Sequence, residues 1–237
     1  MGFIFSGQVV DTLGKKGDDM TNSVMGTLAG VEWRAVLGTT PLEITATVSA
    51  IAGVFLIARQ KILGWPLGLV WAGISAYLAW FEWQLVSDAI LYATYIPIQI
   101  YCWVVWARRG GVASEKRFEP TWLTKPSQLL VVVASVLSII AWGLSVSFLA
   151  KRVEWIPEPS LLWPDSTTTV LNYYAQFLQA RKKMENWIGW LIVNTLGIYI
   201  YWVKGSPIYS IQYAFFLGLG LYGWSQWNKS RNAAPLA

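Results

Sequence analysis

Long apolar runs, separated by short polar or basic segments, recur along this chain from Thr39 to Trp227. A helix needs about 20 mostly apolar residues to cross the core of a bilayer, and seven segments are candidates for such spans. They are residues 39–58, 62–81, 84–106, 127–150, 166–180, 187–203 and 206–227. Hydrophobic residues make up 55% of the chain and charged residues 13%, far from the composition of an average soluble domain. The sequence therefore predicts an all-α integral membrane protein with seven transmembrane helices.

Residues 1–38 precede the first predicted span and differ from it in character. Residues 1–20 are polar and Gly-rich, and they lack the apolar core of a cleavable signal peptide. From Thr21 to Leu37 the apolar residues fall on one helical face, which predicts a short amphipathic helix lying in the membrane interface. At the other end of the chain, residues 228–237 are predicted to form a cytoplasmic tail.

An internal repeat relates the two ends of the chain. A shift of 122 residues superposes Phe55, Leu56, Ala58, Arg59, Lys61, Trp65, Tyr77 and Trp80 on Phe177, Leu178, Ala180, Arg181, Lys183, Trp187, Tyr199 and Trp202. After a gap of one residue, a shift of 121 superposes Tyr92, Tyr101, Trp103 and Trp106 on Tyr213, Tyr222, Trp224 and Trp227. The repeat supports the short, polar fifth span and predicts three helices (39–106), a linker helix (127–150) and three more helices (166–227).

The repeat and the basic residues together predict the topology. Four helices separate equivalent positions, so both repeats should enter the membrane in the same direction. Transporters with such a parallel repeat bind substrate at the repeat interface near the middle of the membrane. Of the 18 Lys and Arg residues, twelve lie on one side of the predicted spans and six on the other. Because cytoplasmic loops carry more Lys and Arg, the C-terminus is predicted to be cytoplasmic and the N-terminus outside.

Composition limits the chemistry that the chain can perform. His is absent and Cys102 is the sole cysteine, which excludes an intramolecular disulfide, a Cys/His zinc site and a His-based triad. The spans show no nucleophile and base pair and no phosphate-binding loop, so we expect neither an enzyme nor a bound metal or cofactor. The basic residues lie in short clusters between apolar runs, which argues against nucleic-acid binding.

Charge is also scarce inside the predicted spans. No carboxylate, Lys or Arg lies at the centre of a span, whereas ion-coupled carriers commonly keep ionisable residues there. A phosphorylated substrate would need a buried Arg or Lys to bind its phosphate. The sequence therefore favours facilitated diffusion of a neutral or singly cationic solute.

The second repeat carries polar side chains that the first repeat lacks. Asn172, Gln176 and Gln179 correspond to Ala50, Val54 and Ile57, Trp190 and Asn194 correspond to Gly68 and Ala72, and Gln212 corresponds to Leu91. An amide that faced lipid would leave its donors and acceptor unpaired, so these side chains should face other helices or a cavity. Interhelical hydrogen bonds and a substrate cavity are both open interpretations. We favour the cavity because three spans change together.

Most of the 16 Trp residues lie near predicted span ends, where membrane proteins carry an interfacial belt of aromatic residues. Belt positions are predicted for Trp80, Trp83, Trp103, Trp106, Trp202, Trp224 and Trp227. Trp187 begins its span, so a belt position and a binding-site position both fit it. Trp190 lies one turn deeper on the face of Asn194, which is a better position for stacking on a flat ring.

The pattern W-x-x-W-x-x-x-N formed by Trp187, Trp190 and Asn194, followed by "LYGWSQW" at Leu221–Trp227 and a basic tail, resembles the PnuC family of bacterial vitamin transporters. The resemblance extends from Pro41 to Arg231. It implies uptake of nicotinamide riboside across the bacterial inner membrane by facilitated diffusion, trapping of the product by a cytoplasmic kinase, and a homotrimer. Family relatives carry thiamine or deoxynucleosides, and a sugar-type uniporter with a parallel repeat is an alternative outside the family.

The resemblance also suggests how the solute would be bound. Trp187 and Trp190 would hold the cationic nicotinamide ring by stacking and cation–π attraction. Polar side chains would pair with the carboxamide and the ribose. We expect this group to contain Asn194, Gln212, Gln176 and Asn172, with Gln99 and Tyr173 as further members.

Overall fold

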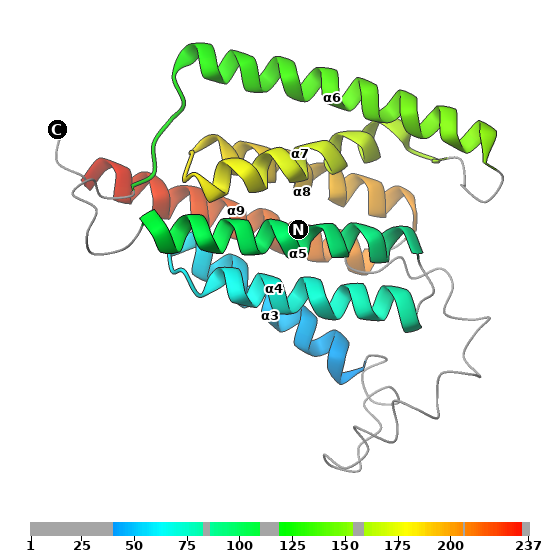
Figure 1. Cartoon of the computed structure of the whole chain (residues 1–237), viewed down its shortest axis with the longest axis horizontal. Coiled ribbons are helices and arrows are strands. Elements are labelled where there is room, and N and C mark those ends of the chain that lie inside the picture. Colours follow the sequence, from blue (N-terminus) through cyan, green and yellow to red (C-terminus); the bar gives the residue numbers. More distant parts are fainter. Residues whose placement is uncertain (1–39, 83–85, 110–118, 154–158, 206, 234–237) are drawn as a thin grey trace. The chain divides into compact units, whose positions relative to one another are not determined.

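The computed structural model describes residues 40–82, 86–109, 119–153, 159–205 and 207–233 of the chain. These residues form seven α-helices and no β-strand (Figure 1): α3 (Pro41–Ala58), α4 (Gly64–Tyr77), α5 (Val86–Arg109), α6 (Lys125–Arg152), α7 (Leu162–Ala180), α8 (Glu185–Val203) and α9 (Pro207–Ala233). A π-helical turn, η1 (Leu78–Glu82), continues α4. Each predicted span overlaps one of these helices, so the all-α class is confirmed. The predicted amphipathic helix at residues 21–37 and Trp83 lie outside the described residues.

The fifth helix, α7, is longer than its hydropathy suggested and begins at Leu162 rather than Ser166. Two of its polar side chains bond to carbonyls of the helix itself. Thr168 Oγ1 donates to the Asp165 carbonyl at 2.9 Å, and Asn172 Nδ2 donates to the Thr168 carbonyl at 2.8 Å. These bonds pair side-chain donors that would otherwise be buried without a partner.

Three helices in the described residues are long and apolar enough to cross a membrane: Pro41–Ala58, Ala89–Arg109 and Lys125–Arg152. The last of these is α6, and it is the most apolar of the three. Its large apolar side chains are mostly exposed on the single chain; Leu130, for example, is 68% exposed. Such a surface is expected on a helix that contacts lipid.

The chain divides into two compact units. One contains Ile57–Ile62 and the residues from Tyr101 onward, and the other contains the described residues up to Leu56 together with Leu63–Ile100. In the second of these units, α3 begins with a capping box, because Thr40 Oγ1 accepts from the Glu43 N–H and the Glu43 carboxylate accepts from the Thr40 N–H. Trp71 of α4 packs edge-on against Tyr92 and Tyr95 of α5 in the core of the same unit.

The unit that begins again at Tyr101 is built on α6, α7, α8 and α9, which pack in chain order. In Figure 1, α6 lies next to α7 and extends beyond it. Glycines allow neighbouring helices to approach closely where they pack. A Cβ on Gly143 would meet the Trp163 ring at 2.8 Å, and one on Gly189 would meet the Ala175 Cβ at 3.0 Å. These contacts fix α7 and α8, which carry most of the predicted site residues.

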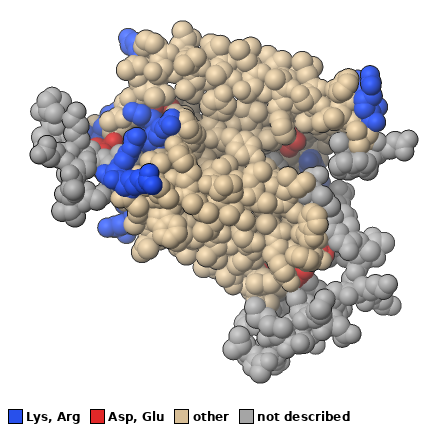
Figure 2. Space-filling view, in the orientation of Figure 1, with Lys and Arg blue, Asp and Glu red and all other residues tan. Residues whose placement is uncertain are grey.

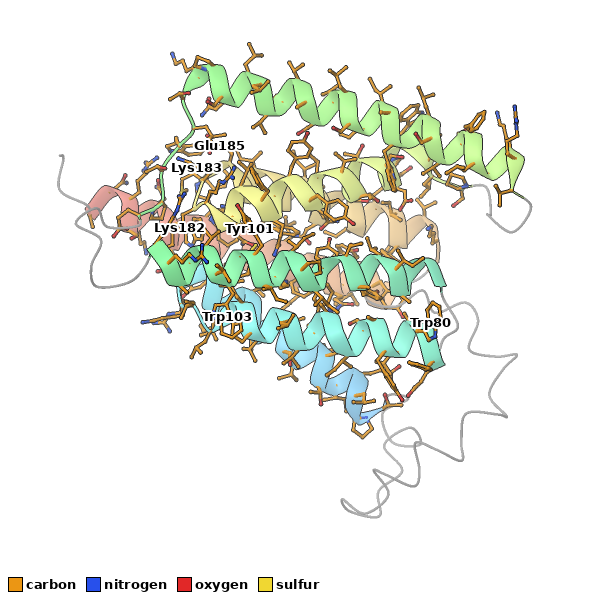
Figure 3. All side chains as sticks on the ribbon, in the orientation of Figure 1. Trp80, Tyr101, Trp103, Lys182, Lys183 and Glu185 are labelled. Carbon is orange, nitrogen blue, oxygen red and sulfur yellow. The ribbon has the colours of Figure 1, made fainter. Side chains whose placement is uncertain are left out.

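A short segment before α6 crosses the turn between α7 and α8. The Thr121 N–H donates to the Lys182 carbonyl and the Met184 N–H donates to the Thr121 carbonyl, both at 3.0 Å. Glu185 at the start of α8 then accepts hydrogen bonds at 2.8 Å from the Leu123 N–H and from Gln128 Nε2. Figure 3 shows Lys182, Lys183 and Glu185 close together at this end. The segment therefore joins the start of α6 to the turn that positions α8.

Replacing Glu185 with alanine should lower the thermal unfolding midpoint of the detergent-solubilised protein. The change removes the acceptor of the Leu123 N–H and the Gln128 amide, at a cost of about 1 to 3 kcal/mol for donors left unpaired. Glu185→Gln keeps a carbonyl oxygen and should retain most of the stability. Equal midpoints for the two variants and the parent protein would show that these hydrogen bonds contribute little.

Candidate functional site

The stripe of Trp187, Trp190 and Asn194 lies on α8, which begins at Glu185 after a tight turn. The Asn186 side chain supports this turn by donating to the Lys183 carbonyl at 2.6 Å. Spacings of three and four residues place the stripe on one helical face. All three side chains are buried, so this face is turned toward protein rather than toward lipid. The belt position that also fitted Trp187 is thereby excluded.

Trp187 is held by residues of α9. Its ring packs edge-on against Trp227, with centroids 5.2 Å apart and an interplanar angle of 86°. It also fills the space above Gly223, where a Cβ would lie 2.1 Å from the Trp187 ring. Only glycine permits this approach, and the position of the indole therefore depends on Gly223. Trp187 is 1% exposed and is fixed before any solute binds.

Trp190 and Asn194 lie further along the same face, and within the described residues their polar groups have no hydrogen-bond partner, as is also true of the Trp187 indole N–H. Trp190 is 6% exposed, and its buried Nε1 finds no hydrogen-bond acceptor among the described residues. Asn194 is 5% exposed, and the described residues supply no hydrogen bond to its amide. An unpaired buried donor costs about 1 to 3 kcal/mol, which a ligand with suitable acceptors would recover. Because the Trp187 ring is packed against Trp227 and Gly223, Trp190 and Asn194 are the better candidates for direct contact with a solute.

The amides predicted on α7 are buried on a helix that packs directly against α8. Asn172 is already bonded to the Thr168 carbonyl, as described above. Gln176 Nε2 points toward the Cys102 thiol, with a donor–sulfur distance of 3.9 Å. Tyr173 is half-buried and, like these two amides, has other interactions. The α7 amides thus take part in contacts within and between helices. Both interpretations of these amides, interhelical hydrogen bonding and the lining of a substrate cavity, therefore stay open.

Gln212 lies on α9, and the contacts between α8 and α9 show which residue of α8 lies opposite it. Trp187 contacts Gly223, Leu191 contacts Gly220, and Tyr213 contacts Gly197, as expected for antiparallel helices. This register places Gln212 near residue 198 of α8, about one turn from Asn194. Gln212 is half-buried, and the structure gives its side chain no hydrogen bond within the described residues. It therefore lies close enough along the helix pair to act with Asn194.

Gln99 belongs to the other unit, where its side chain lies against Gly68. A Cβ on Gly68 would be 2.7 Å from Gln99 Nε2. In the repeat register, Gly68 corresponds to Trp190 and Gln99 corresponds to Gly220. The first repeat thus has a small residue on its second helix and a large one on its third, and the second repeat has the reverse.

The predicted belt is wrong for two residues. Trp80, Trp103 and Trp202 are exposed, as a belt requires, but Trp106 and Trp227 are buried. Their indole N–H groups donate to backbone carbonyls inside the protein. Proximity to a span end could not distinguish these cases, because a buried helix end offers an indole unpaired carbonyls as readily as the interface does.

The buried groups of the described residues are almost all neutral. They are amides, hydroxyls and indoles, and the one buried charged side chain among them, Lys182, lies in the turn between α7 and α8. No group of three His, Cys, Asp or Glu side chains in this part of the chain could hold a metal ion. Such a lining can bind a flat ring and hydrogen-bonding groups, and it offers no strong site for an anion.

The fold and the neutral lining define a class: a multi-pass helical membrane protein with the features of a small-solute transporter. A family model described as nicotinamide mononucleotide transporter matches residues 40–229. The chain therefore belongs to the nicotinamide mononucleotide transporter family, and the predicted resemblance to PnuC proteins is confirmed.

Individual relatives agree with this assignment. The chain is 25% identical over 207 residues to the nicotinamide riboside transporter PnuC of Escherichia coli K12, covering 80% of this chain and 85% of that protein. It is 24% identical to the riboflavin/roseoflavin transporter RibM of Streptomyces davaonensis, with coverages of 80% and 87%. A crystal structure of the vitamin B3 transporter PnuC matches with a TM-score of 0.62 and 25% identity, covering 85% of this chain and 86% of that one. The chain is thus a member of a family of vitamin transporters.

Proposed function

We propose that this protein carries nicotinamide riboside across the bacterial inner membrane by facilitated diffusion, and that a cytoplasmic kinase traps the product by phosphorylation. The observation that supports this most directly is the pair formed by Trp190 and Asn194. Both are buried on one face of α8, and both lack a partner within the described residues. A cationic nicotinamide ring can stack on the indole, and its carboxamide can pair with the amide.

Charge favours the riboside over the phosphorylated mononucleotide for which the family is described. A phosphate is normally bound by Arg or Lys in a buried site. Lys182 is the one buried cation of the described residues, and its Nζ already donates to Gln60 Oε1 at 2.8 Å. The flavin-transporting relative makes a larger flat ring the second candidate. Thiamine and nucleosides are further solutes that a stacking site accommodates.

Orientation and assembly complete the proposal. Figure 2 shows Lys and Arg side chains concentrated at one end of the unit that contains α6 to α9, with a smaller group at the far end of α6. By the positive-inside rule, the larger group is cytoplasmic, which puts the C-terminus in the cytoplasm and the N-terminus outside. We further propose a homotrimer with one pathway in each protomer. Light scattering of the detergent-solubilised protein, corrected for bound detergent, would measure its mass.

Calorimetric titration of the purified protein tests the proposed solute. Nicotinamide riboside should give saturable binding, and nicotinamide mononucleotide should give none, because the one buried cation of the described residues, Lys182, is already bonded to Gln60. Thiamine, uridine and riboflavin are titrated in parallel. Binding of riboflavin or thiamine in place of the riboside would reject the proposed solute, and saturable binding of the mononucleotide would reject the argument from charge.

A further inference from the structure

The first helices of the two repeats end in the same unusual way. Gln60 follows α3 with φ of 57°, and Lys182 follows α7 with φ of 50°; they are the two non-glycine residues with positive φ in the described part of the chain. They are equivalent in the 122-residue register. A left-handed backbone costs an ordinary residue about 1 to 2 kcal/mol, so surrounding contacts must maintain it.

These equivalent residues contact each other directly. Lys182 Nζ donates to Gln60 Oε1 at 2.8 Å, and the same ammonium lies 4.7 Å from the centre of the Trp106 ring. Lys182 is 7% exposed. Equivalent residues of two copies related by a twofold axis meet only near that axis. The contact between Gln60 and Lys182 therefore marks the axis of the proposed parallel repeat.

Two tryptophans form a reciprocal pair around the same point. Trp106 Nε1 donates to the Ala180 carbonyl at the end of α7, and Trp227 Nε1 donates to the Ile57 carbonyl near the end of α3, both at 3.1 Å. Trp106 and Trp227 are equivalent in the 121-residue register, and their rings are 6.1 Å apart. Each repeat thus binds the helix end of the other through the same side chain. All of these residues belong to one compact unit.

We propose that Gln60, Trp106, Lys182 and Trp227, which we call the axis cluster, form a closed gate at the basic end of the transport pathway. Its contacts between the repeats break in each transport cycle. This inference rests on the proposed transport function. A carrier that alternates access must separate its repeats at one end while they remain together at the other, and contacts on the axis are the ones that must open.

The strength of the contacts suits a gate better than a permanent joint. Three hydrogen bonds join the repeats here, and each contributes about 0.5 to 1.5 kcal/mol or somewhat more for the charged donor. Their sum is comparable with the few kcal/mol that separate two populated conformations. Lys182 pairs with a neutral amide rather than a carboxylate, so water can solvate the ammonium when the repeats separate.

A reversible cross-link tests the gate. Cys102→Ser removes the native thiol, and Gln60→Cys/Lys182→Cys places one thiol on each repeat. A short bifunctional methanethiosulfonate joins them in proteoliposomes, and a reductant releases them. We expect cross-linking to lower the initial rate of riboside uptake by about tenfold or more, and reduction to restore it. Binding measured by calorimetry should persist, because the opposite end stays free to open.

A matched pair controls for the chemistry of cross-linking. Thr121→Cys/Lys183→Cys lies at the same end, where Lys183 Nζ donates to Thr121 Oγ1 at 2.8 Å, but Thr121 lies between the repeats along the chain. Cross-linking this pair should leave uptake unchanged. Unchanged uptake after cross-linking Gln60→Cys/Lys182→Cys would overturn the gate.

A measurement without any solute separates this inference from the proposed function. Spin labels are placed on the exposed equivalents of the two repeats as Arg59→Cys/Arg181→Cys. A second pair, Arg181→Cys/Lys229→Cys, joins the end of α7 to the last turns of α9, the third helix of the second repeat, and both pairs carry Cys102→Ser. Electron–electron double resonance should give two distance populations for the first pair and one for the second. A single narrow distance for the first pair would overturn the gate. Two distances without riboside transport would reject the solute and support the gate.

Discussion

Trp190→Ala should weaken nicotinamide riboside binding about 5-fold to 150-fold, because an aromatic ring stacked on an indole contributes about 1 to 3 kcal/mol. Trp190 is buried on the same face of α8 as Asn194, so in the proposed site its loss removes the ring on which the solute stacks. Calorimetric titration measures the change. Trp190→Phe keeps a ring of smaller area and should give an intermediate affinity.

Trp103→Ala is the matched control for this substitution. Trp103 has the same side chain but is 39% exposed, and its loss should change riboside affinity by less than about twofold. Each variant is first checked for a single symmetric peak in size-exclusion chromatography, because truncating a buried Trp also destabilises the fold. Equal losses of affinity in Trp190→Ala and Trp103→Ala would remove the stacking model.

Gly223→Ala should disturb the site by displacing the Trp187 ring that packs against Gly223. The added methyl group would lie 2.1 to 2.5 Å from three atoms of the Trp187 ring, which Trp227 already holds edge-on. The indole must move, at an expected cost of about 1 to 3 kcal/mol for overpacking. We expect a lower thermal unfolding midpoint and weaker riboside binding, because Trp187 is displaced along the face that it shares with Trp190.

Two control variants test whether Gly223→Ala acts through contact between the added methyl group and the Trp187 ring. Gly218→Ala changes the same helix at a position where a Cβ would meet nothing within 4 Å, and it should leave stability and binding unchanged. Trp187→Phe makes room for the methyl group, so Gly223→Ala/Trp187→Phe should be more stable than additivity of the single changes predicts. Strict additivity would show that the two side chains do not compete for the same space.

The arrangement of helices could be predicted from sequence because it depends on hydrophobicity and on the repeat. The run from Pro41 to Ala58 is apolar throughout, and the structure forms α3 over it. The short, polar segment before Ala180 is predicted to be a helix through its equivalence to that run, since its own hydropathy is too low. The helix tolerates this polarity because the Thr168 hydroxyl and the Asn172 amide bond to carbonyls of α7 itself. The grouping into two parallel repeats around a linker remains a prediction, which the axis cluster supports.

Side-chain environments were predictable only in part. The helical spacing of Trp187, Trp190 and Asn194 predicts that they share one face, but it could not show that the Trp187 ring packs directly against Gly223 of α9. The sequence predicts an interfacial position for Trp106 and Trp227, because position along a span says nothing about a carbonyl supplied by the other repeat. The only available signal was their equivalence in the 121-residue register.

Uptake of labelled nicotinamide riboside into proteoliposomes tests the central claim most directly. Liposomes containing the purified protein, and none of the kinase, are prepared without any ion gradient or membrane potential. Facilitated diffusion predicts that the riboside equilibrates to equal concentrations inside and outside, faster than in protein-free liposomes, and that a protonophore has no effect. Accumulation above the external concentration when a proton or sodium gradient is imposed, or uptake no faster than in protein-free liposomes, would contradict it.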